Sequence, residues 1–209
     1  MFTGIVEEVG EVLEADKGRL RIGSRKCLRG TNLGDSIAVN GVDLTVAYMD
    51  EESFHFNVMQ ETYSRSNLST LQPGDPVNLE RSLTLSTKIS GHLVRGVVEA
   101  TGELLSMETE KPGPQASGNA VIARYGAPPN ILRYVVVKGP ITVDGVSLTV
   151  IARDEQSFSV SLVEYTQANT NLTRRQPGER VNLETDIIAR YVEQLLAERA
   201  GENAQFEAK

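Results

Sequence analysis

The chain of 209 residues is 40% hydrophobic and 23% charged, which is ordinary for a globular protein and allows one large domain or two of about 100 residues. Its net charge of −7 comes without a basic cluster, so we expect no nucleic-acid partner. No run approaches the roughly 20 apolar residues that span a bilayer, so we expect no membrane partner either.

Cysteine and histidine are too scarce for several kinds of site. Cys27 is the single cysteine, which excludes an intrachain disulfide and fits a reducing cytoplasm. The two histidines, His55 and His92, lie far apart in the sequence, so we expect no metal site. The acidic start MFTGIVEEVGEV does not resemble a signal peptide. Together these features predict a cytoplasmic protein without bound metal.

Three strand signals follow one another in the first half. Residues 37–46, IAVNGVDLTV, place an Asn-Gly dipeptide among β-branched residues, which predicts a tight hairpin. In SFHFNV (53–58) apolar residues alternate with polar ones, which predicts a strand with one buried face. The turn QPGD then precedes a short strand, VNLE, at 77–80.

The second half gives the same signals and then ends differently. Residues 107–118, METEKPGPQASG, predict an exposed loop. ITVDGVSLTV (141–150) predicts a hairpin with an Asp-Gly turn, and QPGE precedes VNLE at 181–184. From Asp186 onward apolar residues recur at helical spacing, and either Thr185 or Asp186 is placed to cap the helix. The residues leave open whether this helix folds onto its own chain or joins subunits.

The two halves are copies of one unit. A shift of 104 residues aligns 37–80 with 141–184 without a gap, and 21 of the 44 positions are identical. A shift of 92 residues pairs TGIVEEVGEVL (3–13) with RGVVEATGELL (95–105). Each unit holds about six short strands with glycine turns between them, which favours a small closed barrel. We therefore expect an all-β fold with two tandem barrels that arose by internal duplication.

In order and spacing, these motifs resemble the riboflavin synthase family (alpha-chain type), which includes the lumazine proteins. The resemblance covers residues 1–197 and rests on MFTGIVEEVGEV, the two hairpins, the junction GHLVRG and the ending VNLE-x-D-x-IARYVEQLL. It implies two six-stranded Greek-key barrels at 1–90 and 91–185, and a helix and tail at 186–209 through which three chains form a homotrimer. It also implies an active site between the N-terminal barrel of one subunit and the C-terminal barrel of its neighbour.

The resemblance further implies a ligand and a reaction. The family's enzyme transfers a four-carbon unit between two molecules of 6,7-dimethyl-8-ribityllumazine, giving riboflavin and a diaminopyrimidine, and requires no added cofactor. A pocket for such a ligand, or for bound riboflavin, needs apolar walls, backbone hydrogen-bonding groups and short hydroxyl or amide side chains.

Matching the family's motif assigns candidate residues to both barrels. In the first barrel, Gly4, Ile5, Val6 and Met59 would form walls around Asp43, Leu44, Thr45, Asn57 and Thr62. At the junction and in the second barrel, the ligand-binding candidates are Gly96, Val97, Val98, Lys138, Ser147, Leu148, Thr149, Leu162, Val163, Glu164 and Thr166, with the backbone of 162–167 as a pairing edge and Asp144 as a further polar group. The candidates for catalysis are Asp43, Lys138, Asp144 and Ser147. For Thr45 and Thr149, simple β-propensity in a strand is the competing interpretation.

Two positions depart from the family's pattern. Asp43 stands where the family commonly has a cysteine, and Val97 stands where a histidine is expected. A thiolate is a soft nucleophile and imidazole titrates near neutral pH, whereas a carboxylate is a harder base and valine moves no proton. Arg95 and Glu99 accompany these changes. Either the changes are neutral drift, or the first barrel no longer runs the dismutation.

Two further residues have reactive side chains but are interpreted as structural. His92, in GHLV, is interpreted as a structural histidine bonded to a backbone carbonyl, and Cys27 as a packed or surface residue. The functional hypotheses are a transferase acting on 6,7-dimethyl-8-ribityllumazine and, as the alternative, a non-catalytic lumazine or riboflavin-binding paralogue. A purely structural trimer is the third.

Overall fold

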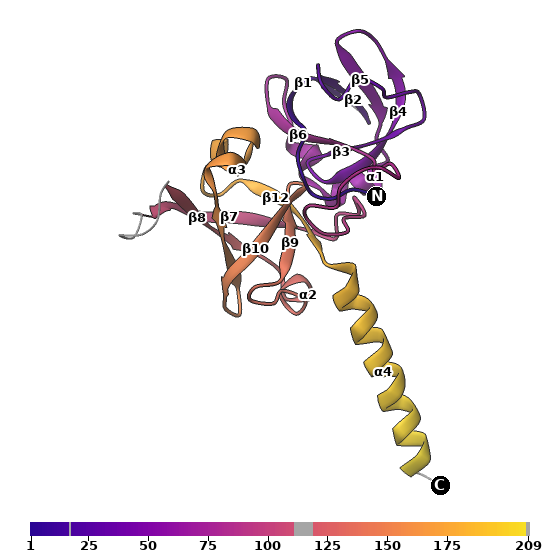
Figure 1. Ribbon diagram of the computed structural model, residues 1–209, viewed down its shortest axis with the longest axis vertical. Coiled ribbons are helices and arrows are strands. Elements are labelled where there is room, and N and C mark those ends of the chain that lie inside the picture. Colours follow the sequence, from indigo (N-terminus) through magenta and orange to yellow (C-terminus); the bar gives the residue numbers. More distant parts are fainter. Residues whose placement is uncertain (17, 111–118, 208–209) are drawn as a thin grey trace.

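The computed structural model describes residues 1–16, 18–110 and 119–207, which form two barrels and a long helix (Figure 1). Six antiparallel strands close the first barrel in the order β1-β2-β5-β4-β3-β6. They are β1 (Glu8–Asp16), β2 (Arg19–Gly23), β3 (Ser36–Val39), β4 (Val42–Met49), β5 (Ser53–Asn57) and β6 (Pro76–Arg81). Two short helices, α1 (Gln60–Arg65) and η1 (Asn67–Thr70), connect β5 to β6.

The second barrel repeats this topology strand for strand. Its order, β7-β8-β11-β10-β9-β12, is that of the first barrel with six added to each number, and it closes in the same way. Its strands are β7 (Ala100–Glu110), β8 (Ala120–Gly126), β9 (Pro140–Val143), β10 (Val146–Arg153), β11 (Ser157–Leu162) and β12 (Arg180–Thr185). Its short helices are α2 (Pro129–Leu132), α3 (Glu164–Asn169) and η2 (Leu172–Arg174). The predicted all-β fold of two six-stranded barrels is confirmed.

Both predicted hairpin turns have the backbone geometry that their dipeptides favour. Asn40 and Asp144 each have φ 45°, and Gly41 and Gly145 each have φ 78°. Positive φ at both central residues is the mark of the type I′ turn, for which Asn-Gly and Asp-Gly are the preferred sequences. The two turns also touch, because a Cβ added to either glycine would lie 2.7 Å from the backbone nitrogen of the other. Glycine is therefore required both by the turn and by the contact.

Each barrel encloses its own apolar core. Phe54 and Phe56 on β5 point into the first core while Asn57 is exposed, so the predicted alternation is confirmed. In the second core the rings of Tyr125 and Phe158 lie with their centroids 5.7 Å apart. Because every second residue of each strand faces inward, a barrel of six short strands buries its apolar side chains without a covering layer.

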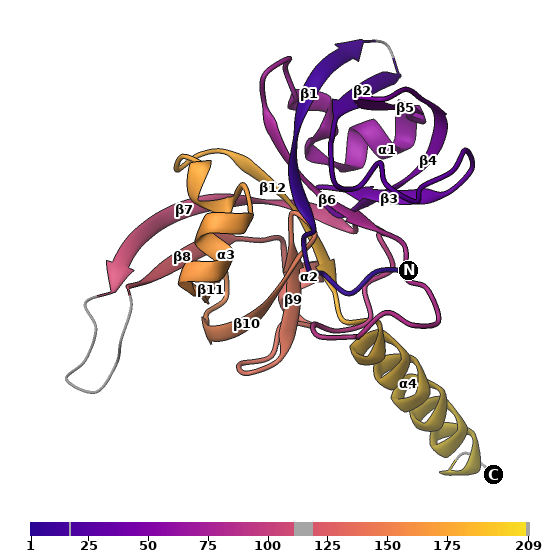
Figure 2. The ribbon, with the colours of Figure 1, turned by 45° about the horizontal axis from the view of Figure 1, so that its top comes forward.

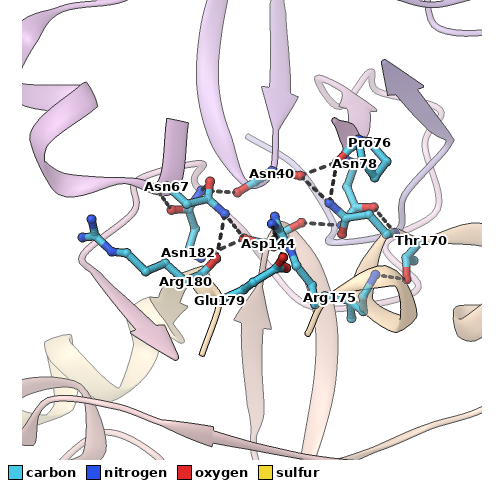
Figure 3. Close-up of polar contacts among 12 residues, drawn as sticks. Asn40, Asn67, Pro76, Asn78, Asp144, Thr170, Arg175, Glu179, Arg180 and Asn182 are labelled. Carbon is cyan, nitrogen blue, oxygen red and sulfur yellow. Dashed lines mark hydrogen bonds and ion pairs between the residues drawn. The ribbon is translucent and has the colours of Figure 1, made fainter. Parts of the chain in front are cut away.

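A buried polar network joins the two barrels (Figure 3). The Asn182 side chain donates to the carbonyl of Asn40 (2.8 Å), and the Asn78 side chain donates to the carbonyl of Asp144 (2.9 Å). In return, the Asn182 side-chain oxygen accepts from the backbone N–H of Asn67 (2.6 Å). The matching bond runs from the N–H of Asn171 to Asn78 (2.8 Å). The contacts thus come in pairs related by the repeat.

One part of this network is unlike its counterpart. Asp144 has no exposed surface, and its carboxylate accepts from the guanidinium of Arg175 at 2.8 Å. Burial raises the pKa of the Asp144 carboxyl, and the neighbouring Arg175 charge opposes that rise. The 104-residue shift places Asn40 and Leu71 at the equivalent positions of the first barrel. The charged pair therefore has a neutral counterpart.

The C-terminal helix α4 (Ile187–Glu207) projects away from the barrels (Figures 1 and 2). The Asp186 carboxylate accepts from the N–H of Ile188 (3.0 Å), so Asp186 rather than Thr185 caps the helix. Glu193 contacts Tyr134 and Arg133 of the second barrel. Several large apolar side chains of its first turns are about half exposed or more: Ile188, Tyr191, Val192, Leu195 and Leu196. No helix in the described ranges is both long and apolar enough to cross a bilayer.

The loop predicted at 107–118 begins later than expected. Strand β7 continues to Glu110, which pairs with Ala120 at the start of β8, so residues 108–110 belong to the paired end of the strand. Composition marked the segment as a loop, but the pairing of two long strands overrides composition at the end of a hairpin. Residues 111–118 lie outside the described part of the chain.

Candidate functional site

In each half of the chain, a segment that contains a glycine packs against the barrel of the other half. The N–H of Ser147 on β10 donates to the carbonyl of Gly4 (2.8 Å), and the N–H of Asp43 on β4 donates to the carbonyl of Gly96 (2.9 Å). Both glycines have positive φ, and a Cβ on either would lie 2.6 Å from the Cβ of its partner. Glycine is therefore needed where these segments cross to the second strand of each hairpin.

Two buried glutamates hold the crossing segments in place. Glu80, at the end of VNLE in the first barrel, accepts from the N–H groups of Thr3 (2.7 Å) and Gly4 (2.9 Å). Glu184, at the same place in the second barrel, accepts from the N–H groups of Arg95, Gly96 and Val97 at 2.8–3.0 Å. Burial raises the pKa of both carboxyl groups, and these N–H donors oppose the rise.

The role of these two glutamates was not predicted from the sequence. The available signal was the identical VNLE at 77–80 and 181–184, whose last residue is charged although it lies in a buried strand. A carboxylate at such a position needs donors, and the nearest unpaired ones are the backbone N–H groups of an irregular segment.

The crossing segment that contains Gly96 places Asp43 and Val97, the two residues that depart from the family's pattern, in one cavity. A pocket of about 440 Å³ opens on the first barrel between β4, α1 and the segment after Gly96. Among the predicted residues it is lined by Asp43, Thr45, Met59, Thr62, Gly96, Val97 and Val98. Ser36, Val42, Glu61 and Arg65 complete the lining. Asp43 and Val97, far apart in the sequence, therefore belong to the same pocket.

In the second barrel the residue equivalent to Asp43 has a histidine partner. The Ser147 hydroxyl lies 2.7 Å from Nδ1 of His92, and the Thr142 hydroxyl lies 3.3 Å from Nε2. Burial lowers the pKa of the His92 imidazole, while the charge of Asp186 raises it. A neutral imidazole that bonds one hydroxyl on each nitrogen can accept a proton from one of them. The expected bond from this ring to a backbone carbonyl is therefore corrected: among the described residues, both ring nitrogens lie against side-chain hydroxyls.

The remaining candidates of the second barrel lie around this hairpin. Thr149, Val163 and Thr166 correspond to Thr45, Met59 and Thr62 by the repeat, and Thr149 and Val163 are exposed. Lys138 has φ 71°, a strained value for a lysine, and its N–H donates to the carbonyl of Val150 (2.8 Å).

The backbone of 162–167 is less open than predicted. Helix α3 occupies most of it, and the carbonyls of Leu162 and Val163 already accept from the side-chain and backbone N–H groups of Gln167. The N–H groups of the first helical turn remain as donors, because they have no partner within a helix. The Glu164 carboxylate accepts from the N–H of Asn119 (3.1 Å).

Several predicted site residues lie elsewhere. Asp144 is enclosed between the barrels, because the tip of its hairpin meets the other hairpin tip rather than solvent. Asn57, at the end of β5, lines a separate depression of about 410 Å³ with Arg19 and His55. Inward-facing positions bury the side chains of Leu44, Leu148 and Leu162.

The segment Gly4, Ile5 and Val6 does not wall the first-barrel pocket as predicted. Gly4 contacts Ser147, and Val6 packs into the core of the second barrel, because the chain crosses between barrels before β1 begins. Ile5 lines a different cavity, of about 590 Å³, which also contains Arg81 and Lys88.

Cys27 packs inside the first barrel, where burial raises the pKa of its thiol to about 12. A thiol in that state is a poor nucleophile at neutral pH. In the described residues, no group of three or more His, Cys, Asp or Glu side chains is arranged to hold a metal ion.

Comparisons with known proteins bear on both halves of the chain. The lumazine binding domain family matches residues 3–82 and 95–186. Riboflavin synthase of Mycobacterium tuberculosis (strain ATCC 25618 / H37Rv) is 46% identical over 204 residues, which are 94% of this chain and 98% of the relative. Riboflavin synthase of Actinobacillus pleuropneumoniae is 40% identical over 203 residues, with 95% and 91% covered.

Solved structures share the fold at low identity. The crystal structure of LumP complexed with riboflavin superposes with a TM-score of 0.79, at 20% identity, and covers 89% of this chain and all of that chain. LumP complexed with 6,7-dimethyl-8-(1'-D-ribityl) lumazine gives a TM-score of 0.77 at 21% identity, with 89% and 99% covered. With two matched lumazine binding domains and relatives aligned over nearly the whole chain, this protein belongs to the riboflavin synthase family.

Proposed function

We propose that the chain binds 6,7-dimethyl-8-ribityllumazine and acts on it as a riboflavin-synthase-type transferase, with the second-barrel hairpin as the site of proton transfer. The observation that carries this proposal is the bond between the Ser147 hydroxyl and Nδ1 of His92 (2.7 Å). The dismutation requires a proton to leave the 7-methyl group of one lumazine. A partly buried, neutral imidazole beside a hydroxyl can take up such a proton and return it to the product.

The residue types around both hairpins suit this ligand. Threonine hydroxyls recur at Thr45 and Thr149 and can bond the hydroxyls of a ribityl chain. In the first pocket Val97, Val98 and Met59 offer apolar surface to a planar ring. The pocket volume of about 440 Å³ lies within the usual range for a small-molecule site.

A non-catalytic binding role is the second candidate, and one observation favours it. Asp43 and Val97 share the first-barrel pocket, so the two positions that differ from the family's chemistry are concentrated in one barrel. A pocket without a thiol and an imidazole can still hold a ring and a ribityl chain.

Turnover of purified protein separates the two candidates. We expect slow formation of riboflavin from 6,7-dimethyl-8-ribityllumazine, followed by absorbance, and a fall of at least about 100-fold in Ser147→Ala. Thr45→Ala, in the first barrel, is the matched control and should lower the rate less. Tight binding of the lumazine without any riboflavin would make the chain a binding protein.

We also propose that α4 assembles the chain into a homotrimer, in which the first barrel of one subunit faces the second barrel of its neighbour. The exposed side chains of Ile188, Val192 and Leu195 would otherwise leave an apolar stripe in water. Deleting 186–209 should yield smaller species with folded barrels in sedimentation. A trimer that survives the deletion would contradict this proposal. Placement of the protein in the cytoplasm stays a prediction from its single buried cysteine.

A further inference from the structure

The two remaining changes from the family's pattern, Arg95 and Glu99, belong to one ion-pair cluster. Their side chains pair at 2.7 Å, and Arg95 also contacts Glu184 at 3.3 Å. The other oxygen of Glu99 pairs with Arg190 of α4 and accepts from the Thr185 hydroxyl (2.9 Å). The side chains of Glu99 and Glu184 are only 8% and 3% exposed, so both carboxylates depend on these cations.

The first barrel makes the equivalent contact without help from a helix. Glu7, which the 92-residue shift aligns with Glu99, pairs with Arg81 of β6 at 2.6 Å. The 104-residue shift places Thr185 at the position of Arg81, so the second copy has no arginine there. Arg190 of α4 supplies the cation instead. A helix that lies outside the repeat therefore completes a contact that the first barrel forms from its own strands.

The cluster is bonded to the wall of the first-barrel pocket. Glu184 accepts from the backbone N–H groups of Arg95, Gly96 and Val97 at 2.8–3.0 Å. Gly96 and Val97 line the pocket, and the carbonyl of Gly96 accepts from the N–H of Asp43 (2.9 Å). No described residue of α4 lines this pocket. The helix can therefore act on it through the cluster, without touching a ligand.

Charge balance indicates what Arg190 contributes. With Arg190 in place, two guanidinium groups face the two carboxylates of Glu99 and Glu184. Without it, both carboxylates would share Arg95. Glu184 would keep three backbone N–H donors, whereas Glu99 would keep only the Thr185 hydroxyl among the described residues. Because a buried carboxylate without a cation is costly, Arg95 would move toward Glu99, and the backbone of the crossing segment would move with it.

We propose that Arg190 is a positioning residue for the first-barrel pocket, through which α4 holds Arg95 and the crossing segment in the geometry that binds a ligand. The effect on affinity rests on the proposed function, because it assumes that this pocket holds a lumazine. The inference gives α4 a second task besides assembly. How the helix sits on the second barrel then controls the affinity of the first.

The test compares Arg190→Gln with Arg133→Gln, its matched control. Both arginines lie over the ring of Tyr134, at 4.7 and 5.2 Å from its centroid. Both also hold α4 to the second barrel, Arg133 through an ion pair with Glu193. Of the two, only Arg190 pairs with Glu99. A loosened helix is therefore common to both variants, whereas the loss of the Glu99 cation is specific to Arg190→Gln.

Titration with 6,7-dimethyl-8-ribityllumazine, followed by ¹⁵N–¹H NMR, resolves the barrels, since the amides of Val97 and Ser147 report on the first and the second. At Val97 we expect Arg190→Gln to weaken binding about fivefold or more, the lower end of coupling between two sites, and Arg133→Gln to change it little. Arg190→Lys should recover part of the affinity, because it restores the charge. Equal losses in the two glutamine variants, or at the two amides, would overturn the role of Arg190.

Glu99→Gln separates charge balance from the mere loss of a contact. Combined with Arg190→Gln it removes both partners of one ion pair, so that Arg95 again faces a single carboxylate, that of Glu184. The double variant should therefore bind the lumazine more tightly at Val97 than Arg190→Gln does. Additive losses in the two single variants would contradict the charge-balance argument and overturn the inference.

The ligand-free spectrum keeps this inference distinct from the proposed function. Before any ligand is added, movement of the crossing segment should shift the Val97 amide resonance more in Arg190→Gln than in Arg133→Gln. If the native chain binds no lumazine, the proposed function fails, and this shift still decides whether Arg190 positions the pocket wall. If the lumazine binds but the Val97 amide responds alike in both variants, only the role of Arg190 fails.

Discussion

The two barrels have the same strand order, yet their hairpins carry different side chains at corresponding positions. Residues that form a turn or bond the backbone are identical in both barrels, as with Gly41 and Gly145 or Glu80 and Glu184. Positions whose side chains face a cavity have diverged, and Asp43 opposite Ser147 is the clearest pair. Duplication therefore retained what a turn or a crossing segment requires geometrically, and it left the chemistry of each pocket free to change.

The largest expected effect comes from restoring the family's residues in the first barrel. Asp43→Cys combined with Val97→His should raise riboflavin formation about 10²- to 10⁴-fold, the usual contribution of general acid–base catalysis. Each single replacement should give less than the pair, because both side chains line one pocket and act on one ligand. Steady-state rates with 6,7-dimethyl-8-ribityllumazine measure the gain. Efficient turnover by the native chain would instead favour neutral drift at these positions.

The next effect concerns the charged pair that distinguishes the two hairpin tips. Asp144→Asn should lower the free energy of unfolding by about 3 kcal/mol, because the buried Arg175 loses its carboxylate. Adding Arg175→Leu copies the neutral arrangement of Asn40 and Leu71, and most of the loss should be recovered. Urea denaturation of the single and double variants gives the coupling. Additive losses would contradict the pairing.

A smaller effect should separate the two barrels in ligand affinity. Thr149→Val should weaken binding of 6,7-dimethyl-8-ribityllumazine about five- to 150-fold, because a buried hydroxyl partner on the ligand goes unsatisfied. Thr45→Val should change it less, since Asp43 places a negative charge beside the ligand of that pocket. Isothermal titration of both variants checks the order, and the reverse order would assign the tighter site to the first barrel.

The smallest effect should appear in the pH dependence of stability. Burial lowers the pKa of His92 in the folded chain below its unfolded value of about 6.5, so the native state favours the neutral ring. The contribution of His92 to the free energy of unfolding is therefore fully present above about pH 6.5. It declines as the pH falls toward the folded pKa, where the ring must take up a proton. Thermal unfolding between pH 5 and 8 should show this slope, and His92→Asn should flatten it. An unchanged slope in that variant would assign it to another group.

Much of the fold could be predicted from local patterns. The Asn-Gly and Asp-Gly turns and the alternation around Phe54 each depend on a few neighbouring residues, and these predictions are confirmed. The sequence left the helix cap open between Thr185 and Asp186, and the structure selects Asp186. The pairing of strands into a closed barrel followed from the number and length of the strands. Such signals act over one turn or one strand, which is the range that periodicity and turn chemistry describe.

The site was less predictable because its contacts join distant segments. Neither hydrophobic alternation nor turn chemistry indicates that Gly4 lies against Ser147 or that Gly96 lies against Asp43. Asp144 was assigned to a pocket because its motif matched the family's, whereas its burial depends on the meeting of two hairpin tips. A tertiary contact between the halves decided each of these cases.

The meeting of the two hairpin tips also bears on how the tandem chain arose. Gly41 abuts Gly145 as Gly145 abuts Gly41, and the asparagine bonds of the network are exchanged in the same reciprocal way. This is the geometry of an isologous interface, in which one surface is complementary to itself. A single-barrel ancestor could therefore have paired with a second copy through these contacts before gene fusion linked them. Fusion then permitted a one-sided change such as Asp144 with Arg175, which a symmetric dimer would have been forced to bury twice.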